Sequence, residues 1–220
     1  MELIGHRGCA MQYPENTVTA VSSAAEYVDA VEVDVRRCST GELVVFHDET
    51  VDRVTDGTGA VSELPWHRLR ECEVLGSGET VPRLSEVLAA VPDDIDLQIE
   101  LKETGLAVDV RDAVAETDHE VAVSSFLPAA IEEVNDLAWD VPTGYLFESD
   151  PHGGLETALD LSCDAVHPHY DLCLDSDVVD AAHGAGLRVV AWKAARTSEE
   201  VRALAAAGVD GVTADRWDIA

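Results

Sequence analysis

Residues 31–47 read VEVDVRRCSTGELVVFH, and this stretch decides which fold the rest of the chain can form. Val31–Val35 and Leu43–His47 both have the β-branched, apolar character of buried strands. Only a short polar turn, Cys38–Glu42, separates them. Neighbouring parallel strands need a connection of about a dozen residues or more, so these two strands must form an antiparallel hairpin.

Strand-like and helix-like segments alternate along the rest of the chain. Short β-rich runs, which predict strands, lie at residues 3–5, 31–35, 43–47, 97–102, 121–126, 143–147, 165–169, 189–193 and 211–214. Helical patterns with start and stop signals lie at residues 17–28, 84–91, 128–137, 176–185 and 198–207. Asn16 is the expected N-cap of the first helix, and Thr197 or Ser198 that of the last. Without the extra strand 43–47, eight βα units are left.

We therefore predict an α/β fold, a TIM (β/α)8 barrel with a small insertion after the second barrel strand. The barrel would occupy residues 1–220 as a single domain, with the insertion at about 37–82. Such barrels commonly run as one domain in about 200–250 residues, which fits this length. No internal repeat or low-complexity segment suggests a second domain.

The composition indicates a folded protein without a stable membrane anchor. Hydrophobic residues make up 46% of the chain, which excludes a disordered acidic protein. No apolar run approaches the roughly 18–20 residues needed to span a bilayer, and the N-terminus lacks the features of a signal peptide. We expect a cytoplasmic protein, in which the five cysteines are reduced and partly buried.

The charge balance is extreme, with 44 acidic and 14 basic residues and a formal net charge of −30. At about 1 M salt the Debye length falls to roughly 3 Å, so the self-repulsion of such a surface largely disappears. The balance is therefore typical of a protein from a halophilic organism, and an ordinary acidic mesophilic protein is the alternative. A nucleic-acid partner is excluded on these charges.

Polar side chains gather where the predicted strands end. They are His6-Arg7, Glu32-Val33-Asp34, Glu100-Leu101-Lys102, His167-Pro168-His169, Trp192-Lys193 and Asp215. Active sites of these barrels lie at the C-terminal ends of the strands. This distribution predicts an active site on that rim.

Glu32 and Asp34 lie two residues apart on one strand, so both side chains point to the same face, inside the barrel. Glu100 adds a third carboxylate from the next barrel strand. Three converging carboxylates form an oxygen-rich site for a hard divalent ion, Mg²⁺ or Ca²⁺. The alternative is a network of carboxylates neutralised by Lys102, Arg7 and Arg36 without a metal ion.

His6 and His47 are the groups best suited to proton transfer near neutral pH. Asp48 follows His47 and could orient its ring. Either histidine alone could be an ordinary surface residue, but both are predicted beside the three acids. His167 and His169 form another same-face pair. We interpret one as facing the pocket and the other as packed or solvated, and a transition-metal site is the alternative.

Several motifs occur in a fixed order along the whole chain. They are His6-Arg7-Gly8, Pro14-Glu15-Asn16-Thr17, Glu32-Val33-Asp34, Val45-Phe46-His47-Asp48, Arg53-Val54-Thr55, Pro82-Arg83-Leu84 and Glu100-Leu101-Lys102. Weaker ones are Ser124-Ser125-Phe126, His183-Gly184-Ala185-Gly186 and Gly208-Val209-Asp210-Gly211, which leads to Asp215. This series resembles the glycerophosphodiester phosphodiesterase family, and its first half is the more specific.

The resemblance implies a phospholipase-C-like (PLC-like) phosphodiesterase barrel that hydrolyses glycerophosphodiesters to sn-glycerol 3-phosphate and an alcohol with a divalent metal ion. By position, Glu32, Asp34 and Glu100 would be the metal ligands, and His6 and His47 the acid–base pair. Arg7 and Lys102 would bind the phosphate. Trp192 would line the glycerol side of the pocket, or it is a packed barrel aromatic.

The chain departs from the family pattern at the rim. Lys193-Ala194-Ala195 follows Trp192 where relatives usually have a Thr or Ser and then an Asn, and Arg216-Trp217 replaces a segment that usually holds a proline. Because these positions border the pocket, the sequence does not determine which alcohol the substrate carries. Another phosphodiester, such as a lysophospholipid or an archaeal lipid headgroup, is the alternative substrate. A catalytically silent, metabolite-binding barrel would be expected to lack a histidine or an acid of the site, and none is missing.

Overall fold

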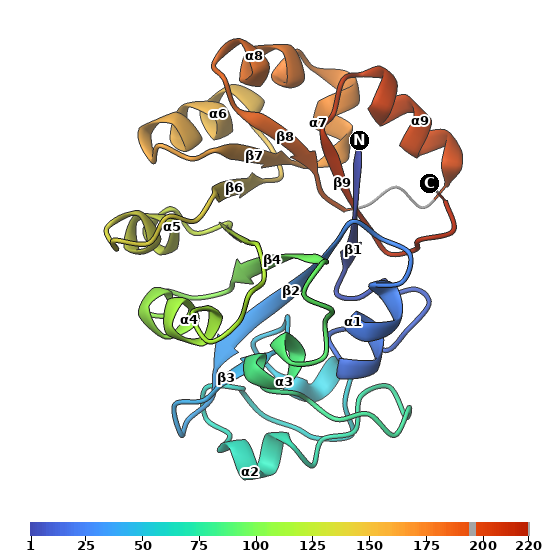
Figure 1. The fold of residues 1–220 in the computed structure, drawn as a ribbon, viewed down its shortest axis with the longest axis vertical. Helices are drawn as coiled ribbons and strands as arrows, with labels where there is room; N and C mark the ends of the chain where they lie inside the picture. The colour runs from blue at the N-terminus through green and yellow to red at the C-terminus, as the bar shows by residue number, and fades with distance from the viewer. Residues whose placement is uncertain (194–196, 220) are drawn as a thin grey trace.

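Eight of the apolar runs form parallel strands that close into a barrel in the computed structural model, which describes residues 1–193 and 197–219 (Figure 1). These strands are β1 (Glu2–His6), β2 (Ala30–Arg37), β4 (Asp96–Leu101), β5 (Val121–Ser125), β6 (Thr143–Phe147), β7 (Ala165–Pro168), β8 (Arg188–Ala191) and β9 (Gly211–Ala214). Their order is β1-β9-β8-β7-β6-β5-β4-β2, and β1 pairs with β2 to close the ring. The predicted TIM barrel is confirmed.

The remaining described strand, β3 (Leu43–Val45), lies outside the ring of eight. It pairs antiparallel with the end of β2, as the short connection requires. Val35 faces Val45 and Arg37 faces Leu43 in this hairpin. The strand ends two residues earlier than predicted. Past Val45, the N–H of Phe46 still donates to the carbonyl of Asp34 at 2.9 Å, and the carbonyl of His47 accepts a hydrogen bond from the side chain of Arg36, through Nε, at 2.9 Å.

Helices surround the barrel (Figure 1). They are α1 (Val18–Ala24), α2 (Trp66–Leu69), α3 (Leu84–Leu88), α4 (Ala107–Val114), α5 (Pro128–Asn135), α6 (Pro151–Asp160), α7 (Tyr170–Asp175), α8 (Val178–Gly184) and α9 (Ser198–Ala206), with the 3₁₀ helix η1 (Val51–Arg53). All five predicted helices are present, each shorter than predicted. With ten residues, α6 is the longest described helix, about half the length that a bilayer-spanning helix needs.

Sequence patterns did not predict four of the described helices, α2, α4, α6 and α7. Two of these, α4 and α6, complete the crossovers after β4 and β6. Gly153 and Gly154 lower the intrinsic helix propensity of α6. A Cβ at Gly154 would lie 2.5 Å from Cγ of Phe147, so the glycine lets this helix pack directly on the ring. Tertiary packing, rather than propensity, therefore stabilises α6. Beyond β9 the described chain contains no helix.

The strands are covered on both faces, and this arrangement positions the rim residues. Val31, Val33 and Val35 point outward into the main core between the barrel and the helices, and all three are fully buried. Burying such a side chain contributes about 1.5–3 kcal/mol. Glu32 and Asp34 alternate with these valines, so their side chains point into the barrel.

The segment between β2 and α3, residues 38–83, has a small core of its own. This core includes Val44, Phe46, Val51, Leu69 and Val81, all nearly inaccessible to solvent. In Figure 1 the segment extends from one side of the barrel, with α2 at its far end. We call residues 38–83 the insertion. Because it is packed internally, the insertion can hold polar side chains at the rim in fixed positions.

The opposite, N-terminal end of the barrel encloses a cavity of about 150 Å³. Ile4, Gln98 and His167 line it, and the ion pair between Arg188 Nη2 and Glu2 Oε2, at 2.7 Å, lies among the residues at its edge. Gln98 donates a hydrogen bond to Ser124 Oγ at 3.2 Å. The barrel interior is therefore polar in part, even far from the rim.

Candidate active site

β1 ends in a tight turn that carries His6 and Arg7 to the rim. Arg7, Gly8 and Cys9 have φ angles of 51°, 73° and 64°, all in the left-handed region. A Cβ at Gly8 would lie 2.6 Å from the carbonyl carbon of Ala20, so only glycine fits there. The turn directs the backbone N–H of Arg7 to Glu32 Oε2, at 3.0 Å. Strained backbone of this kind persists only where the surrounding structure fixes it, commonly at functional sites.

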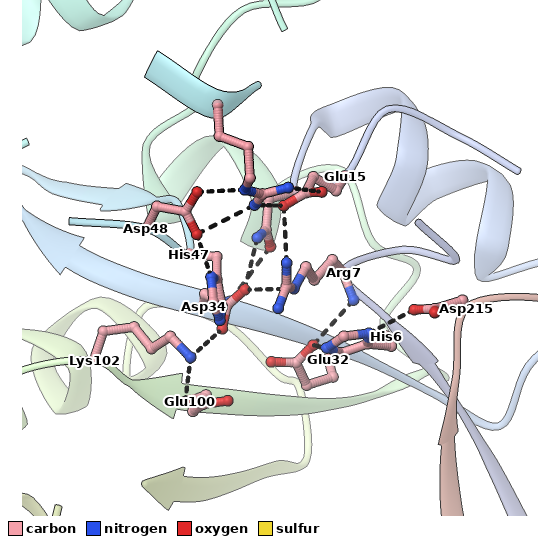
Figure 2. Close-up of polar contacts among 12 residues, drawn as sticks. His6, Arg7, Glu15, Glu32, Asp34, His47, Asp48, Glu100, Lys102 and Asp215 are labelled. Atoms are coloured by element: carbon pink, nitrogen blue, oxygen red, sulfur yellow. Dashed lines mark hydrogen bonds and ion pairs between the residues drawn. The ribbon is translucent and has the colours of Figure 1, made fainter. Parts of the chain in front are cut away.

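The three predicted metal ligands lie together inside the rim (Figure 2). Glu32 and Asp34 come from β2 and Glu100 from β4, and one carboxylate oxygen of each lies within 4.8 Å of the others. All three side chains are buried. Glu32 Oε1 has no hydrogen-bond partner among the described residues. This unsatisfied oxygen and the all-oxygen donor set fit a hard divalent ion.

The pKa values of these acids reflect crowded negative charge. Burial, reinforced by the charge of Asp34, raises the pKa of Glu32 to about 8. The same two causes raise the pKa of Glu100 above its usual range. Burial alone would also raise the pKa of Asp34, but the charges of Lys102 and then Arg7 lower it. A bound cation would offset the repulsion that raises the first two values.

Two cations flank the carboxylates. Arg7 Nε lies 3.1 Å from Asp34 Oδ2, and Lys102 Nζ lies 3.0 Å from Asp34 Oδ1. Lys102 also contacts Glu100 Oε1. The predicted neutralisation by Lys102 and Arg7 is thus present beside the oxygen cluster. Arg36, proposed as a third partner, instead lies with Nη1 3.6 Å from Glu103 Oε2.

Each of the two candidate histidines has an aspartate behind its ring (Figure 2). His6 Nδ1 lies 2.7 Å from Asp215 Oδ1, and His47 Nδ1 lies 2.6 Å from Asp48 Oδ1. An ionised carboxylate only accepts hydrogen bonds, so each Nδ1 carries the proton and donates it. Nε2 is then the atom left for substrate, as in a His–Asp pair of a hydrolase.

The surroundings shift the two histidines in opposite directions. Burial alone would lower the pKa of His6, but the hydrogen bond that its ring donates to Asp215 and the charge of Glu32 raise it. Burial lowers the pKa of His47, and the cations Lys102 and Arg7 contribute in the same direction. The pKa shifts of the two rings therefore have opposite directions.

Asn16 has a different role from the one predicted. The N-cap of α1 is Thr17, whose hydroxyl accepts a hydrogen bond from the N–H of Ala20 at 3.2 Å. Asn16 is buried with a φ of 58°, and its Nδ2 donates to Asp34 Oδ2 at 2.8 Å. The expected cap was wrong because Asn and Thr both favour that position, and only the fold brings Asn16 to Asp34.

Trp192 lies beside the cluster rather than in it. Its Nε1 donates to the carbonyl of Phe147 at 3.0 Å, and its ring meets Phe126 edge-on at 5.0 Å between centroids. Phe126 in turn lies 5.9 Å from Lys102 Nζ. Trp192 thus supports an aromatic wall next to the cations. Ala194 and Ala195, which depart from the family pattern, lie outside the described residues.

His167 and His169 have different surroundings: His167 lines the cavity at the N-terminal end of the barrel rather than a pocket at the rim, and His169 is packed. His167 is buried in the barrel, with its ring against Gly144, and burial lowers its pKa to about 3. His169 packs edge-on against Trp192, with 5.1 Å between ring centroids. No group of three metal-ligating side chains among the described residues includes either one.

A cavity of about 470 Å³ opens beside the cluster between the insertion and the loop after β5. It is lined by Arg36, His47, Asp48, Glu49, Glu100, Leu101, Lys102, Phe126 and Leu127. Ionisable side chains from the insertion and from β4 therefore share one opening with an aromatic ring. A small molecule with an anionic group could be held there.

Comparison with known proteins decides the family. The model of the glycerophosphoryl diester phosphodiesterase family matches residues 6–219, nearly the whole chain. The chain belongs to this family. A glycerophosphodiester phosphodiesterase of Caldanaerobacter subterraneus subsp. tengcongensis is 31% identical over 228 residues, covering 97% of this chain and 93% of that protein.

Solved structures of glycerophosphodiester phosphodiesterases agree with this assignment. An Oleispira antarctica phosphodiesterase, solved with the product sn-glycerol-3-phosphate, has a TM-score of 0.90 and 27% identity over 98% of this chain and 93% of its own. An enzyme from Thermotoga maritima has a TM-score of 0.84 and 26% identity, covering 99% and 96%. Enzymes of the family hydrolyse glycerophosphodiesters, and this chain is an enzyme of that class.

Three supporting residues of the candidate site make contacts that the sequence did not predict, although Asp215 itself was expected on the rim. Asp215, behind His6, comes from the end of β9, which pairs with β1 only in the closed barrel. Glu15 accepts a hydrogen bond from Arg7 Nη1 at 2.9 Å. Arg53 reaches the site from η1 in the insertion. All three lie in or beside the motifs on which the family resemblance rests, but contacts such as that of Asp215 with His6 join segments far apart along the chain.

Proposed function

We propose that this protein hydrolyses glycerophosphodiesters to sn-glycerol 3-phosphate and an alcohol at a divalent-metal site, with His6 and His47 as the acid–base pair. The observation that carries the proposal is the pair of His–Asp contacts beside three buried carboxylates. Positioned proton-transfer groups can serve the attacking and leaving oxygens, and a cation can stabilise negative charge on the phosphate, so this set of groups suits hydrolysis of an anionic diester.

Glu32, Asp34 and Glu100 would hold the metal ion, Mg²⁺ or Ca²⁺. When bound, the ion supplies positive charge that balances these acids and stabilises negative charge on the phosphate. The protein's own cations act beside it. Arg7 and Lys102, both at the carboxylate cluster, would bind phosphate oxygens and stabilise the charge that develops on them.

One histidine accepts the proton of the attacking hydroxyl through Nε2, and the other donates a proton to the leaving alkoxide. Asp215 and Asp48 keep each ring in the required tautomer and orientation. Positioned acid–base catalysis of this kind contributes roughly 10²–10⁴-fold in rate. The attacking group is either water, which gives sn-glycerol 3-phosphate directly, or the glycerol 2-hydroxyl, which expels the alcohol and leaves a cyclic phosphate that water then opens. A substrate that lacks the 2-hydroxyl distinguishes them, since only direct attack by water would cleave it.

The test is hydrolysis of glycerophosphocholine with Mg²⁺ or Ca²⁺ at about 2 M KCl, followed by a coupled assay for sn-glycerol 3-phosphate. We expect turnover that chelation abolishes, and losses of roughly 10²–10⁴-fold in kcat for His6→Ala and His47→Ala. His152→Ala is the matched control, since His152 is exposed on α6. Absence of turnover of glycerophosphocholine, lysophospholipid and ether-lipid headgroups with either ion would contradict the proposal.

We also infer that the protein works in concentrated salt. The net charge of −30 leaves a self-repelling surface unless salt screens it. Lowering KCl from about 2 M to about 0.1 M should therefore lower the melting temperature, whereas addition of sucrose at low salt should restore little of it. An unchanged melting temperature would remove the argument for salt adaptation.

A further inference from the structure

Arg53 links two parts of the chain that carry catalytic groups. It belongs to η1 in the insertion. Its Nη1 and Nη2 donate to Glu15 Oε2 and Oε1 at 3.1 and 2.7 Å, and Glu15 lies in the loop between β1 and α1. Its Nε contacts Asp48 Oδ2, and Nη2 also donates to Asp48 Oδ1 at 3.2 Å. One guanidinium therefore bridges two carboxylates, each in a paired contact.

Both carboxylates face the proposed catalytic machinery on their other side (Figure 2). Asp48 accepts the hydrogen bond of His47 Nδ1 at 2.6 Å. Glu15 accepts a hydrogen bond from Arg7 Nη1 at 2.9 Å, and Arg7 is the expected phosphate ligand. The contacts thus form an unbroken series from the histidine of the insertion to the arginine of β1, with Arg53 at its middle.

The chemistry of the bridge explains why an arginine stands there. A planar guanidinium presents two edges, each able to form two parallel hydrogen bonds to a carboxylate. An ammonium group is a point charge and cannot fix both carboxylates in this way. The side chain of Arg53 is 48% exposed, so salt would weaken a simple ion pair at this position. Paired hydrogen bonds retain their directionality in salt.

We propose that Arg53 is a positioning residue that sets the His47 ring and the Arg7 guanidinium in a common geometry. The proposal rests on the proposed function of the site. Arg53 touches neither the carboxylate cluster nor, by our assignment, the substrate, and it acts through Asp48 and Glu15. The ordinary alternative is that it only fastens the insertion to the barrel.

The experiment compares Arg53→Gln and Arg53→Lys with wild type in the glycerophosphocholine assay. Arg70→Gln is the matched control, because Arg70 is an exposed arginine of the same insertion. We expect Arg53→Gln to lower kcat by roughly 10- to 100-fold, since small misplacements of catalytic groups cost about that much. Arg53→Lys should recover only a minor part of the loss, and Arg70→Gln should match wild type within about twofold.

A set of single and combined variants distinguishes a role of Arg53 in positioning His47 and Arg7 from a role only in attaching the insertion to the barrel. Asp48→Asn should lower mainly kcat, because it acts on His47. Glu15→Gln should raise mainly KM and weaken sn-glycerol 3-phosphate binding in calorimetry, because it acts on Arg7. In the Asp48→Asn, Glu15→Gln background, adding Arg53→Gln should change kcat by less than about twofold, since residues that act as a unit are not additive.

Three results would overturn the proposal. They are wild-type kcat in Arg53→Gln, full recovery in Arg53→Lys, or an undiminished Arg53→Gln effect in the double-variant background. The last result, with a lowered melting temperature, would assign Arg53 to fastening alone. If wild type itself turns over no phosphodiester, the proposed function fails. In that case, calorimetric binding of sn-glycerol 3-phosphate still tests the role of Arg53. Equal affinity of wild type and Arg53→Gln for this product would reject the link between Arg53 and Arg7.

Discussion

The buried histidine beneath the active site should make the fold sensitive to acid. His167 lies inside the barrel at the N-terminal cavity, 4% exposed, and its Nδ1 has no hydrogen-bond partner among the described residues. Burial, and then the charge of Arg188, lowers its pKa from 6.5 to about 3. The native state therefore holds this ring neutral at pH values where the unfolded chain protonates it.

The sign and size of the effect follow from proton linkage. Between about pH 3 and 6.5 the unfolded chain binds more protons at this ring than the native state, so the free energy of unfolding decreases as the pH falls. A pH of 5 is about 1.5 units below the pKa of 6.5 that His167 has in the unfolded state. Each unit corresponds to about 1.4 kcal/mol, so His167 should lower the stability by about 2 kcal/mol between pH 7.5 and 5.

Urea unfolding of wild type and His167→Gln, at about pH 7.5 and pH 5 in the same KCl concentration, measures this contribution. Glutamine keeps a polar side chain against Gly144 but does not titrate. All other groups titrate equally in both proteins, so their contributions cancel in the difference. Wild type should lose about 2 kcal/mol more than the variant on acidification. If both lose the same free energy within about 0.5 kcal/mol, the ring is solvated or protonated in the folded state and the reasoning fails.

Two further predictions concern the metal ligands and the turn after β1. Glu32→Gln should weaken Ca²⁺ and Mg²⁺ binding by at least about tenfold in calorimetry, since even residues that only support a ligand cost that much; unchanged affinity would mean that the ion binds elsewhere. Gly8→Ala should destabilise the fold by about 1–3 kcal/mol in urea unfolding, because φ is 73° and a Cβ would meet the backbone of Ala20. Gly184→Ala, on a helix with no atom within 4 Å of the added Cβ, is its control and should be neutral or stabilising.

Local patterns were sufficient to predict the barrel because each strand has a distinct apolar run and the connections leave few topologies. The length of the turn after Val35 alone required the antiparallel pairing of β3. Alternation on β2 likewise placed Glu32 and Asp34 on the inner face. These predictions depend on chain geometry within a few residues. The glycine-containing helix α6 was not predicted, because it is stabilised by packing on Phe147 and a local helical pattern does not reveal that contact.

The contacts of the supporting residues of the site could not be predicted for the same reason. Asp215 is 209 positions from His6, and their contact exists only because β9 closes the barrel against β1. Asn16 had a local explanation as a helix cap, and its buried contact with Asp34 overrides that explanation. Residue types and spacing indicate the groups that carry chemistry. The partners that orient those groups depend on the closed ring of strands and on the packed insertion.

The antiparallel hairpin also explains how a second histidine reaches the site. A helical crossover after β2 would carry the chain to the outer face of the barrel. β3 instead turns back along β2, and the N–H of Phe46 donates to the carbonyl of Asp34 at 2.9 Å. His47, the next residue, is thereby held at the rim near Asp34, opposite the His6 side of the cluster (Figure 2). The one described strand that interrupts the regular βα alternation thus brings His47 to the rim, where the barrel strand β1 brings His6.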